Sequence, residues 1–330
     1  MGGLGPISKV DTARPARPIA PMQALIPFPE IDPAIFTLEL FGLSFSLRWY
    51  ALAYIAGILA GWRMGIALGT RATLWPGNTA PLSRDKGDDM VTWIVLGIIL
   101  GGRMGYVLFY KPMFYWENPD QIIRLWDGGM AFHGGLLGVV IGVWIFCARH
   151  AIPKMNIADL LAVCVPPGLF FGRVANFINA ELYGRPTDVA WGVKFPSMCH
   201  DPIRQGCEVA GEWFYYGTEV ARHPSQLYEA GLEGLLLGLI LLIMALRGSF
   251  KIPGLTVGVF FLGYGVSRFI VEFYRLADEQ FMTPDNPAGY VMRLGEWGIT
   301  KGQQLSLPMV ALGLGLILYA LLRQRRTAPA

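Results

Sequence analysis

Long apolar stretches alternate with short polar loops along the whole chain. Apolar runs of ~20 residues recur, and a helix of about 20 residues crosses the roughly 30 Å hydrocarbon core of a bilayer. This pattern predicts an all-α polytopic membrane protein with seven transmembrane helices. We expect these helices at approximately 46–68, 90–110, 131–149, 157–179, 226–246, 253–274 and 303–323, with ends accurate to a few residues.

Lysines and arginines in the short loops predict the orientation, because cytoplasmic loops carry an excess of them. Eleven fall on one side, namely Arg63, Arg71, Arg84, Lys86, Arg149, Lys154, Arg247, Lys251, Arg323, Arg325 and Arg326. Five fall on the other side, namely Lys111, Arg124, Arg275, Arg293 and Lys301. We therefore expect an external N-terminus and a cytoplasmic C-terminus.

Composition agrees with a membrane protein and excludes other classes. Of 330 residues, 53% are hydrophobic and only 15% are charged, against about 25% charged in an ordinary soluble domain. The net charge of +3, with no basic run, gives no support for nucleic-acid binding. Four cysteines are too few for a disulfide scaffold, and Cys147 and Cys164 lie in apolar helices as small core residues.

Two segments do not fit the pattern of helices. Residues 180–225 form the longest stretch between spans, and short strand-like pieces between turns predict a small external cap domain there. Cys199 and Cys207 in this cap predict a disulfide, with a zinc site that adds His200 and His223 as the less favoured alternative. Residues 1–22 are rich in Pro and Arg and lack the apolar region of a signal peptide, so we expect a disordered extension before the transmembrane domain at 23–330.

Three arginines lie inside the predicted helices at nearly the same depth. Arg103, Arg173 and Arg268 each precede the end of an apolar run by about five to seven residues. A charge in a bilayer costs at least about 2.5–3.5 kcal/mol on insertion scales. Three such charges at one level predict an anion between them.

Other polar residues are expected near the same external level. Arg173 and Asn176 share a helix face, and Tyr264, Arg268 and Glu272 follow one stripe at intervals of four. The inward-running helices add groups near their external ends, namely Arg48, Tyr50, His133, Gln226, Glu229 and, one turn deeper, Glu233. This distribution predicts a polar cavity open to the outer leaflet.

Each of these groups also has a structural interpretation. Glu272 can simply neutralise Arg268, and Tyr50 can belong to an interfacial aromatic belt. His133 can cap a helix, and Asp159 is interpreted as a cap of its own helix start. Glu229 and Glu233 can brace neighbouring arginines, and Arg103 can extend toward the interface or pair with one of these carboxylates.

Two stretches favour a phosphate site over these structural roles. GRVANFINAELYGR at 172–185 concentrates Arg, Asn, Glu and Tyr at a helix exit, and RHPSQLYE at 222–229 does the same at a helix entry. The glycines of GGMAFHGG permit close backbone approach, and free N–H groups near a helix start bind anions.

The chain resembles the bacterial prolipoprotein diacylglyceryl transferase family. The similarity rests on RWYALAY at 48–54, GGRMGYVLFY at 101–110, WDGGMAFHGG at 126–135, GRVANFINAELYGR at 172–185, RHPSQLYEAGLEG at 222–234, GYGVSRFIVEFYR at 263–275 and QQLSLPM at 303–309. These segments occur in order between about residue 24 and residue 323. Ala131, Ala180 and Ala277 depart from the family pattern, but no charged group is lost.

The resemblance implies a reaction at the outer face of the bacterial inner membrane. Such enzymes transfer the diacylglyceryl group of phosphatidylglycerol to the thiol of the lipobox cysteine in a preprolipoprotein, which is the first step of lipoprotein maturation. The products are a thioether and glycerol phosphate. We expect neither a cofactor nor a metal ion. A secondary transporter of anions or lipids is the main alternative, although no repeated half is apparent in the sequence.

The resemblance also implies roles for particular residues. Arg173 occupies the phosphate-binding position, Arg103 is expected to support it, and the thiol proton passes either to His133 or to no dedicated base, with Arg268 stabilising the thiolate. The resemblance implies that Tyr50, His133, Asn176, Tyr264, Arg268 and Glu272 are catalytic positions and that Arg173, Glu181 and Gly184 bind the substrate. We add Arg103 to the substrate-binding residues as a supporting charge, because of its place inside an apolar run. Fixed arginines would stabilise the charge that develops on the departing phosphate.

Overall fold

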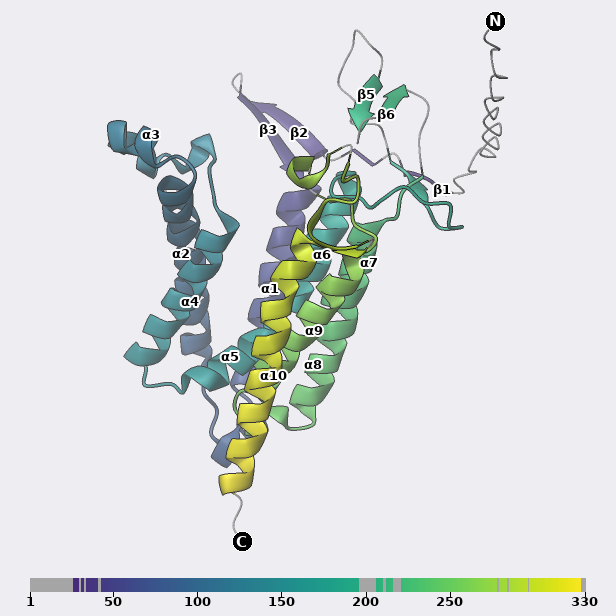
Figure 1. The fold of residues 1–330 in the computed structure, drawn as a ribbon. Coiled ribbons are helices and arrows are strands. Elements are labelled where there is room, and N and C mark those ends of the chain that lie inside the picture. The colour runs from purple at the N-terminus through teal and green to yellow at the C-terminus, as the bar shows by residue number, and fades with distance from the viewer. Residues whose placement is uncertain are drawn as a thin grey trace, which may run out of the picture.

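A computed structural model gives the arrangement of the chain. It describes residues 26–29, 31–32, 34–40, 43–195, 206–209, 212–215, 221–277, 279–283, 285–295 and 297–327. The long helices run side by side, with the C-terminus at the end of the molecule opposite the β-hairpins (Figure 1). The predicted extension at 1–22 lies outside the described residues, as do Cys199, His200 and the side chain of Cys207.

Six helical segments in the described residues are long and apolar enough to cross a membrane. They are α1 (Trp49–Gly69), α2 (Arg84–Phe109), α4 (Phe132–Arg149), the α5–α6 pair (Lys154–Cys164 and Pro166–Ile178), the stretch from α7 (Ser225–Glu229) through η5 (Ala230–Leu236) to α8 (Leu237–Leu246), and α10 (Lys301–Thr327). The remaining apolar helix, α9 (Leu255–Val271), is shorter, with 17 residues. Each coincides with a predicted span.

The helix boundaries differ from the sequence-based ranges at several places. Residues 46–48 belong to strand β3 instead of α1, and Arg84 and Lys86 lie in the first turn of α2 instead of a loop. Helix α9 ends at Val271, so Glu272 follows the helix in a turn. The fourth span is interrupted at Val165, since the two prolines that follow it remove N–H donors and disfavour an unbroken helix.

The described chain also contains β-structure, so the all-α prediction was incomplete. Four two-stranded sheets are present: β1 (Ile26–Pro27) with β4 (Val193–Lys194), β2 (Ala34–Leu40) with β3 (Leu43–Arg48), β5 (Gly206–Val209) with β6 (Glu212–Tyr215), and β7 (Tyr290–Leu294) with β8 (Trp297–Thr300). All are antiparallel except β1–β4. β4, β5 and β6 belong to the predicted cap at 180–225.

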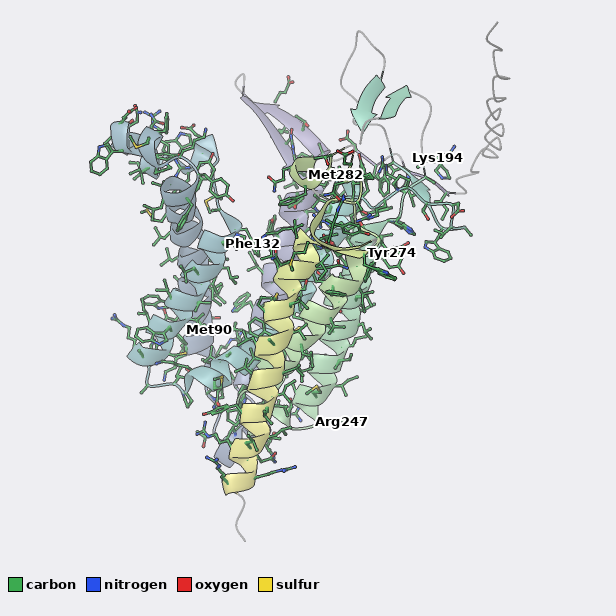
Figure 2. The ribbon with its side chains drawn as sticks, in the orientation of Figure 1. Met90, Phe132, Lys194, Arg247, Tyr274 and Met282 are labelled. Carbon is green, nitrogen blue, oxygen red and sulfur yellow. The ribbon has the colours of Figure 1, made fainter. Side chains whose placement is uncertain are left out.

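The two ends of the helical bundle differ in what surrounds them. Lys194 lies beside the sheets and Arg247 lies at the opposite end (Figure 2). At the Arg247 end, Trp75 stacks on Phe250 with ring centroids 4.3 Å apart, within a buried cluster that joins the helix ends. At this end, a hydrophobic core therefore holds the helix ends together.

Helices α2 and α4, with the short helix α3 (Pro112–Glu117), form an arm beside the main bundle (Figure 1). Gly97, Gly101, Gly134 and Gly138 line the contact between α2 and α4. A Cβ atom at Gly101 or Gly134 would lie under 2.5 Å from a carbonyl oxygen of the facing helix. Such small residues let helices approach closely in lipid, where no hydrophobic effect drives them together.

Asp159 on α5 caps a helix, but not the one expected. Its carboxylate accepts N–H bonds from Gly254 at 2.7 Å and Val257 at 2.8 Å, at the start of α9. The side chain is fully buried. It therefore anchors the helix that carries Arg268 instead of capping the start of its own helix.

Removing this cap is expected to destabilise the bundle. Asp159→Ala leaves two buried N–H groups at the start of α9 unsatisfied, and such groups cost about 1–3 kcal/mol each. Thermal unfolding of the detergent-purified protein should shift to lower temperature. Asp120→Ala, on an exposed side chain, is the control, and equal melting temperatures of the two variants would contradict the assignment.

Candidate active site

Two of the three arginines that lie in apolar helices meet in the bundle. Arg173 on α6 and Arg268 on α9 both contact the carboxylate of Glu229 on α7. The distances are 2.9 Å from Arg173 Nε to Oε2 and 2.5 Å from Arg268 Nη1 to Oε1. The predicted grouping of Arg173 with Arg268 is thus present, with a carboxylate between them.

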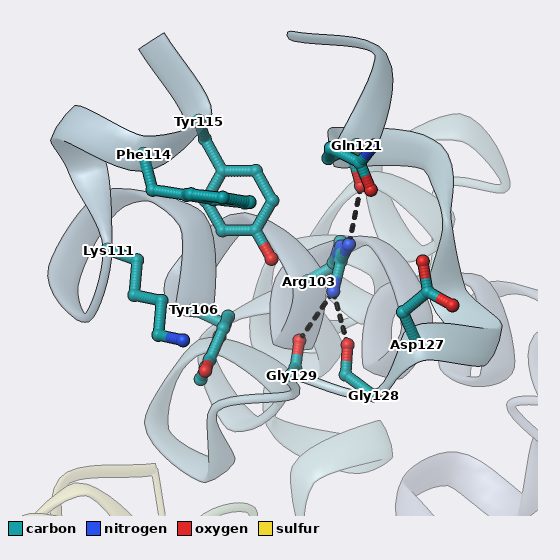
Figure 3. Close-up of a pocket in the computed structure, with 9 residues that line it drawn as sticks. All are labelled: Arg103, Tyr106, Lys111, Phe114, Tyr115, Gln121, Asp127, Gly128 and Gly129. Atoms are coloured by element: carbon teal, nitrogen blue, oxygen red, sulfur yellow. Dashed lines mark hydrogen bonds between the residues drawn. The ribbon is translucent and has the colours of Figure 1, made fainter. Parts of the chain in front are cut away.

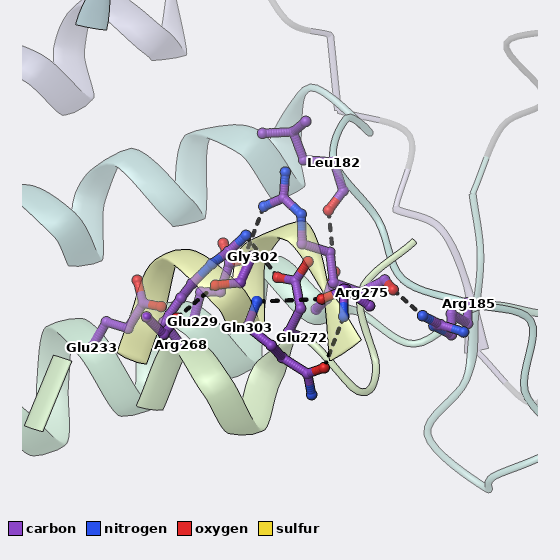
Figure 4. A network of polar contacts seen from close by, with 12 residues as sticks. Leu182, Arg185, Glu229, Glu233, Arg268, Glu272, Arg275, Gly302 and Gln303 are labelled. Atoms are coloured by element: carbon purple, nitrogen blue, oxygen red, sulfur yellow. Dashed lines mark hydrogen bonds and ion pairs between the residues drawn. The ribbon is translucent and has the colours of Figure 1, made fainter. Parts of the chain in front are cut away.

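Glu229 also binds a third arginine, Arg275, which follows α9. Arg275 Nη1 donates to Glu229 Oε1 at 3.1 Å (Figure 4). Glu229 has no exposed surface, and a buried carboxylate is tolerated only when it is paired and hydrogen-bonded. The three arginines supply that compensation and hold α6, α7 and the end of α9 together.

Glu272 forms the second ion pair of Arg268, with Nη2 2.8 Å from Oε2. The start of α10 presses against this carboxylate, because a Cβ atom on Gly302 would lie 2.3 Å from the Glu272 carboxyl carbon (Figure 4). Thr300 and Gln303 exchange side-chain to backbone bonds at 3.1 and 3.3 Å and fix this helix start. The partly positive end of α10 therefore faces Glu272.

Arg173 keeps unused hydrogen-bond donors. Among the described residues its ion pairs are with Glu229 and Glu233, the latter at 3.9 Å from Nη2, and neither pair uses Nη1. Its side chain is 20% exposed. A guanidinium has five N–H donors in a planar fork, so Arg173 can offer several of them to an oxyanion without breaking its ion pair to Glu229.

Glu233 and Tyr264 lie behind the arginines. Glu233 belongs to the π-helical turn η5 and is fully buried. Tyr264 on α9 lies close enough to Glu233, Arg173 and Arg268 to interact electrostatically with them. A Cβ atom on Gly234 would lie under 3 Å from backbone atoms of Phe170, so this glycine lets η5 contact the helix that carries Arg173.

Tyr50, Asn176 and Glu181 form a second polar group, one helical turn beyond Arg173. Asn176 Nδ2 donates to Glu181 Oε1 at 3.3 Å. The Tyr50 side chain at the start of α1 lies near both Asn176 and Glu181. Gln226 Nε2 donates to the Glu181 carbonyl at 2.6 Å. The structure thus brings the predicted residues Tyr50, Asn176 and Glu181 together.

Gly184 has a packing role in the described structure. Its N–H donates to the His223 carbonyl at 2.8 Å, and a Cβ atom would lie 2.4 Å from the Tyr274 carbonyl oxygen. The strand-like connection at 184–185 therefore passes between the entry to α7 and the exit of α9. Beside it, burial lowers the pKa of His223, whose Nδ1 lies 3.0 Å from the Tyr228 hydroxyl.

Arg103 is not part of the arginine cluster. All five of its N–H groups donate to backbone carbonyls of the segment 121–129, which folds over the end of α2 (Figure 3). Nε donates to Ile122 at 2.8 Å, and Nη2 donates to Gln121 at 2.6 Å and Arg124 at 2.9 Å. Nη1 donates to Gly128 and Gly129. Pairing with a carboxylate, one of the expected alternatives, does not occur.

His133 lies apart from the arginine cluster. It is the second residue of α4, on the arm, and its side chain is exposed. Its neighbour Phe132 is also exposed, on the arm at the level shown in Figure 2. The ring of Phe132 lies edge-on to the His133 imidazole, with the two centroids 5.6 Å apart. Seven of the predicted residues therefore lie around the bundle site, and Gly184 adjoins it through a backbone bridge to Arg275. His133 and Arg103 lie on the arm instead.

Arg275 is a site residue that the sequence analysis treated only as a loop charge. Its spacing of seven residues from Arg268 continues the stripe through Tyr264, Arg268 and Glu272, and this was the available signal. Glu229 and Glu233 were predicted either to line the polar cavity or to brace neighbouring arginines, and both do contact arginines. Their spacing of four residues places both on one face of the α7–η5 helix.

The fold and site define a polytopic helical membrane protein with a buried arginine–glutamate cluster. The family model for prolipoprotein diacylglyceryl transferase matches residues 38–319. The chain belongs to the prolipoprotein diacylglyceryl transferase family.

Relatives named phosphatidylglycerol–prolipoprotein diacylglyceryl transferase are similar over nearly the full length. The protein of Ruegeria pomeroyi is 56% identical over 91% of this chain and 98% of its own. That of Roseobacter denitrificans is 51% identical over 90% and 98%, respectively. That of Rhizobium meliloti is 44% identical over 94% and 99%.

Replacing Arg103 should loosen the arm without touching the arginine cluster. Arg103→Lys leaves three donors for five carbonyls, so we expect a loss of at least about 2 kcal/mol. Hydrogen exchange of the amides at 118–131 should become faster. Arg124→Lys is the control because that side chain is half exposed, and unchanged exchange in Arg103→Lys would contradict this role.

Gly302→Ala should disturb Glu272. The added methyl group overlaps the carboxylate, and overpacking of this kind costs about 1–3 kcal/mol. Gly315→Ala on the same helix is the matched control, because a Cβ atom there meets nothing within 4 Å. Thermal unfolding should separate the two variants, and a Gly302→Ala protein as stable as Gly315→Ala would show that the close approach is absent.

Proposed function

We propose that this protein transfers the diacylglyceryl group of phosphatidylglycerol to the thiol of a lipobox cysteine in a preprolipoprotein signal peptide. The names of its relatives support both substrates. The observation that carries the proposal is Arg173, a membrane-embedded guanidinium with unused donors beside Arg268. A phosphodiester anion suits these donors, because arginine binds phosphate oxygens in a bidentate manner and keeps its charge.

The reaction follows from the charges around the phosphate. The thiolate sulfur attacks the carbon of the diacylglycerol moiety that bears the phosphate ester. The bond between this carbon and the ester oxygen breaks, and its electron pair leaves on the oxygen of glycerol phosphate. The leaving phosphate gains a second negative charge. Arg173 and Arg268 stabilise that charge most strongly in the transition state, which is what accelerates the step.

The remaining predicted residues have supporting roles in this proposal. Asn176, Glu181 and Tyr50 bind the glycerol hydroxyls or orient the thiol, and Tyr264 and Glu272 hold Arg268 in position. Gly184 keeps the connection beside the site close-packed, and Arg103 shapes the arm. The proton of the thiol goes to His133 or leaves without a dedicated base; exposure of His133 makes it available to an incoming peptide.

We place the protein in the bacterial inner membrane with seven spans, of which α9 is the shortest. The excess of Lys and Arg at the Arg247 end supports a cytoplasmic C-terminus. The sheets and the cap at 180–225 then lie outside, and the arginine cluster lies toward the external leaflet. This is the level at which an outer-leaflet phosphate meets a cysteine emerging after its signal peptide.

Transfer by the purified protein tests the proposal. Reconstitution with phosphatidylglycerol and a lipobox peptide should give a diacylglyceryl adduct on cysteine, detected by mass spectrometry. Arg173→Ala should lower the rate about 10²–10³-fold, as loss of one oxyanion donor does. The rate of Arg173→Lys should lie between those of the wild-type protein and Arg173→Ala, since lysine keeps the positive charge but not the bidentate donor geometry of the guanidinium.

Arg124→Ala is the matched control, because its side chain is half exposed on the arm. No adduct with the wild-type protein, or equal adduct with Arg173→Ala, overturns the proposal. Flux of a soluble anion across sealed vesicles would favour a transporter instead.

A further inference from the structure

The buried cluster is electrically neutral before any lipid binds. It contains three arginines and three glutamates, namely Arg173, Arg268, Arg275, Glu229, Glu233 and Glu272. The formal charges of these six groups therefore sum to zero. An anionic phosphodiester bound beside them would leave one uncompensated negative charge. Such a charge is costly in a region of low dielectric constant, because solvation by water is lost.

The three glutamates are not equally compensated. Glu229 contacts three arginines within 3.1 Å, and Glu272 contacts Arg268 at 2.8 Å. Glu233 has only Arg173, at 3.9 Å, and neither of its buried carboxylate oxygens has a hydrogen-bond partner among the described residues. Glu233 is thus the carboxylate whose ionised form is held least firmly.

The groups that face Glu233 come from every helix around it. Arg173 approaches from α6, Glu229 from α7, Arg268 and Tyr264 from α9, and Arg275 from the turn after α9. Glu229 repels its negative charge, and the arginines attract it. A phosphate on Arg173 would draw the nearest of these cations toward itself and add a second repelling charge.

We propose that Glu233 takes up one proton when the anionic phosphodiester binds beside Arg173, which keeps the buried charge balanced. This inference rests on the proposed function, since it assumes that phosphatidylglycerol binds at Arg173. The neutral cluster binds a lipid with one negative charge and takes up one proton on Glu233, so the resulting complex is again neutral. Glu233 acts as a positioning residue. Once protonated, it no longer attracts Arg173, so the guanidinium can turn away from Glu233 toward the lipid phosphate.

The π-helical turn that carries Glu233 supports this role. Such turns are rare and occur frequently at functional sites. Here η5 presses its backbone on α6 at Gly234 and Phe170, next to the turn with Arg173. This contact holds Glu233 behind the arginine, away from water, where a change in its protonation alters the net charge of the site.

Binding of phosphatidylglycerol at different pH values tests the proposal. The full-length protein in phosphatidylcholine nanodiscs is titrated with phosphatidylglycerol between about pH 6 and pH 9, where the phosphodiester does not titrate. For uptake of one proton, Kd should rise toward tenfold per pH unit above the range in which free Glu233 ionises. The Glu233→Gln protein should bind with a Kd that does not depend on pH.

Direct measurement of proton uptake gives an independent result. In weakly buffered solution, lipid addition should consume about one proton per bound lipid with the wild-type protein and none with Glu233→Gln. Glu117→Gln, on the exposed tip of the arm, should keep the wild-type slope. Glu229→Gln should weaken binding at every pH, because its arginines lose their anchor, and melting temperatures identify any variant that is misfolded.

The outcomes separate the two proposals. A pH-dependent Kd that persists unchanged in Glu233→Gln, or a wild-type Kd without pH dependence, overturns the role of Glu233 and leaves the proposed function intact. Absence of phosphatidylglycerol binding by the wild-type protein at any pH, or binding unaffected by Arg173→Ala, overturns the proposed lipid site itself.

Discussion

The fully buried carboxylate of Glu229 is the contact on which the bundle site depends. Without compensation it would cost several kcal/mol in a medium of low dielectric constant, so the protein must bring cations to it from elsewhere. Arg173, Arg268 and Arg275 all reach it within 3.1 Å. These arginines lie on α6, on α9 and just after α9, so the carboxylate ties its own helix α7 to two segments far from it in the sequence. Asp159 contributes from the other end by capping α9.

In the proposed function, this arrangement also keeps an arginine available for an anionic ligand. Each arginine of the cluster has enough carboxylate contact to be stable in the bundle, but Arg173 is left with donors that no described residue uses. Arg103 differs from Arg173 because all five of its N–H groups donate hydrogen bonds to backbone carbonyls. An arginine in a helix therefore serves binding or architecture according to its unused donors, and depth in the membrane does not distinguish the two.

Much of the site was predictable from residue spacing. Tyr264, Arg268 and Glu272 recur every four residues and do meet the same cluster, and Arg173 with Asn176 shares a face of α6 as expected. The hairpins β2–β3 and β7–β8 were missed because their residues merge with the apolar spans or lie among charged loop residues. Residue spacing also could not predict the need for glycine at positions 184 and 302. The backbone of Tyr274 and His223 lies against Gly184, and the carboxylate of Glu272 lies against Gly302.

The sequence by itself determined the membrane class, the approximate spans and the family, because these depend on local hydropathy and on runs of consecutive residues. It also determined which helices carry charge. Only the tertiary structure decided how those charges pair: that Arg103 holds a loop, that Asp159 caps α9, and that Glu233 finds no hydrogen-bond partner in the part of the chain that the structure describes. The physical reason is that pairing of buried charges depends on distances of 3–4 Å between helices, and the order of residues along one helix does not specify such distances.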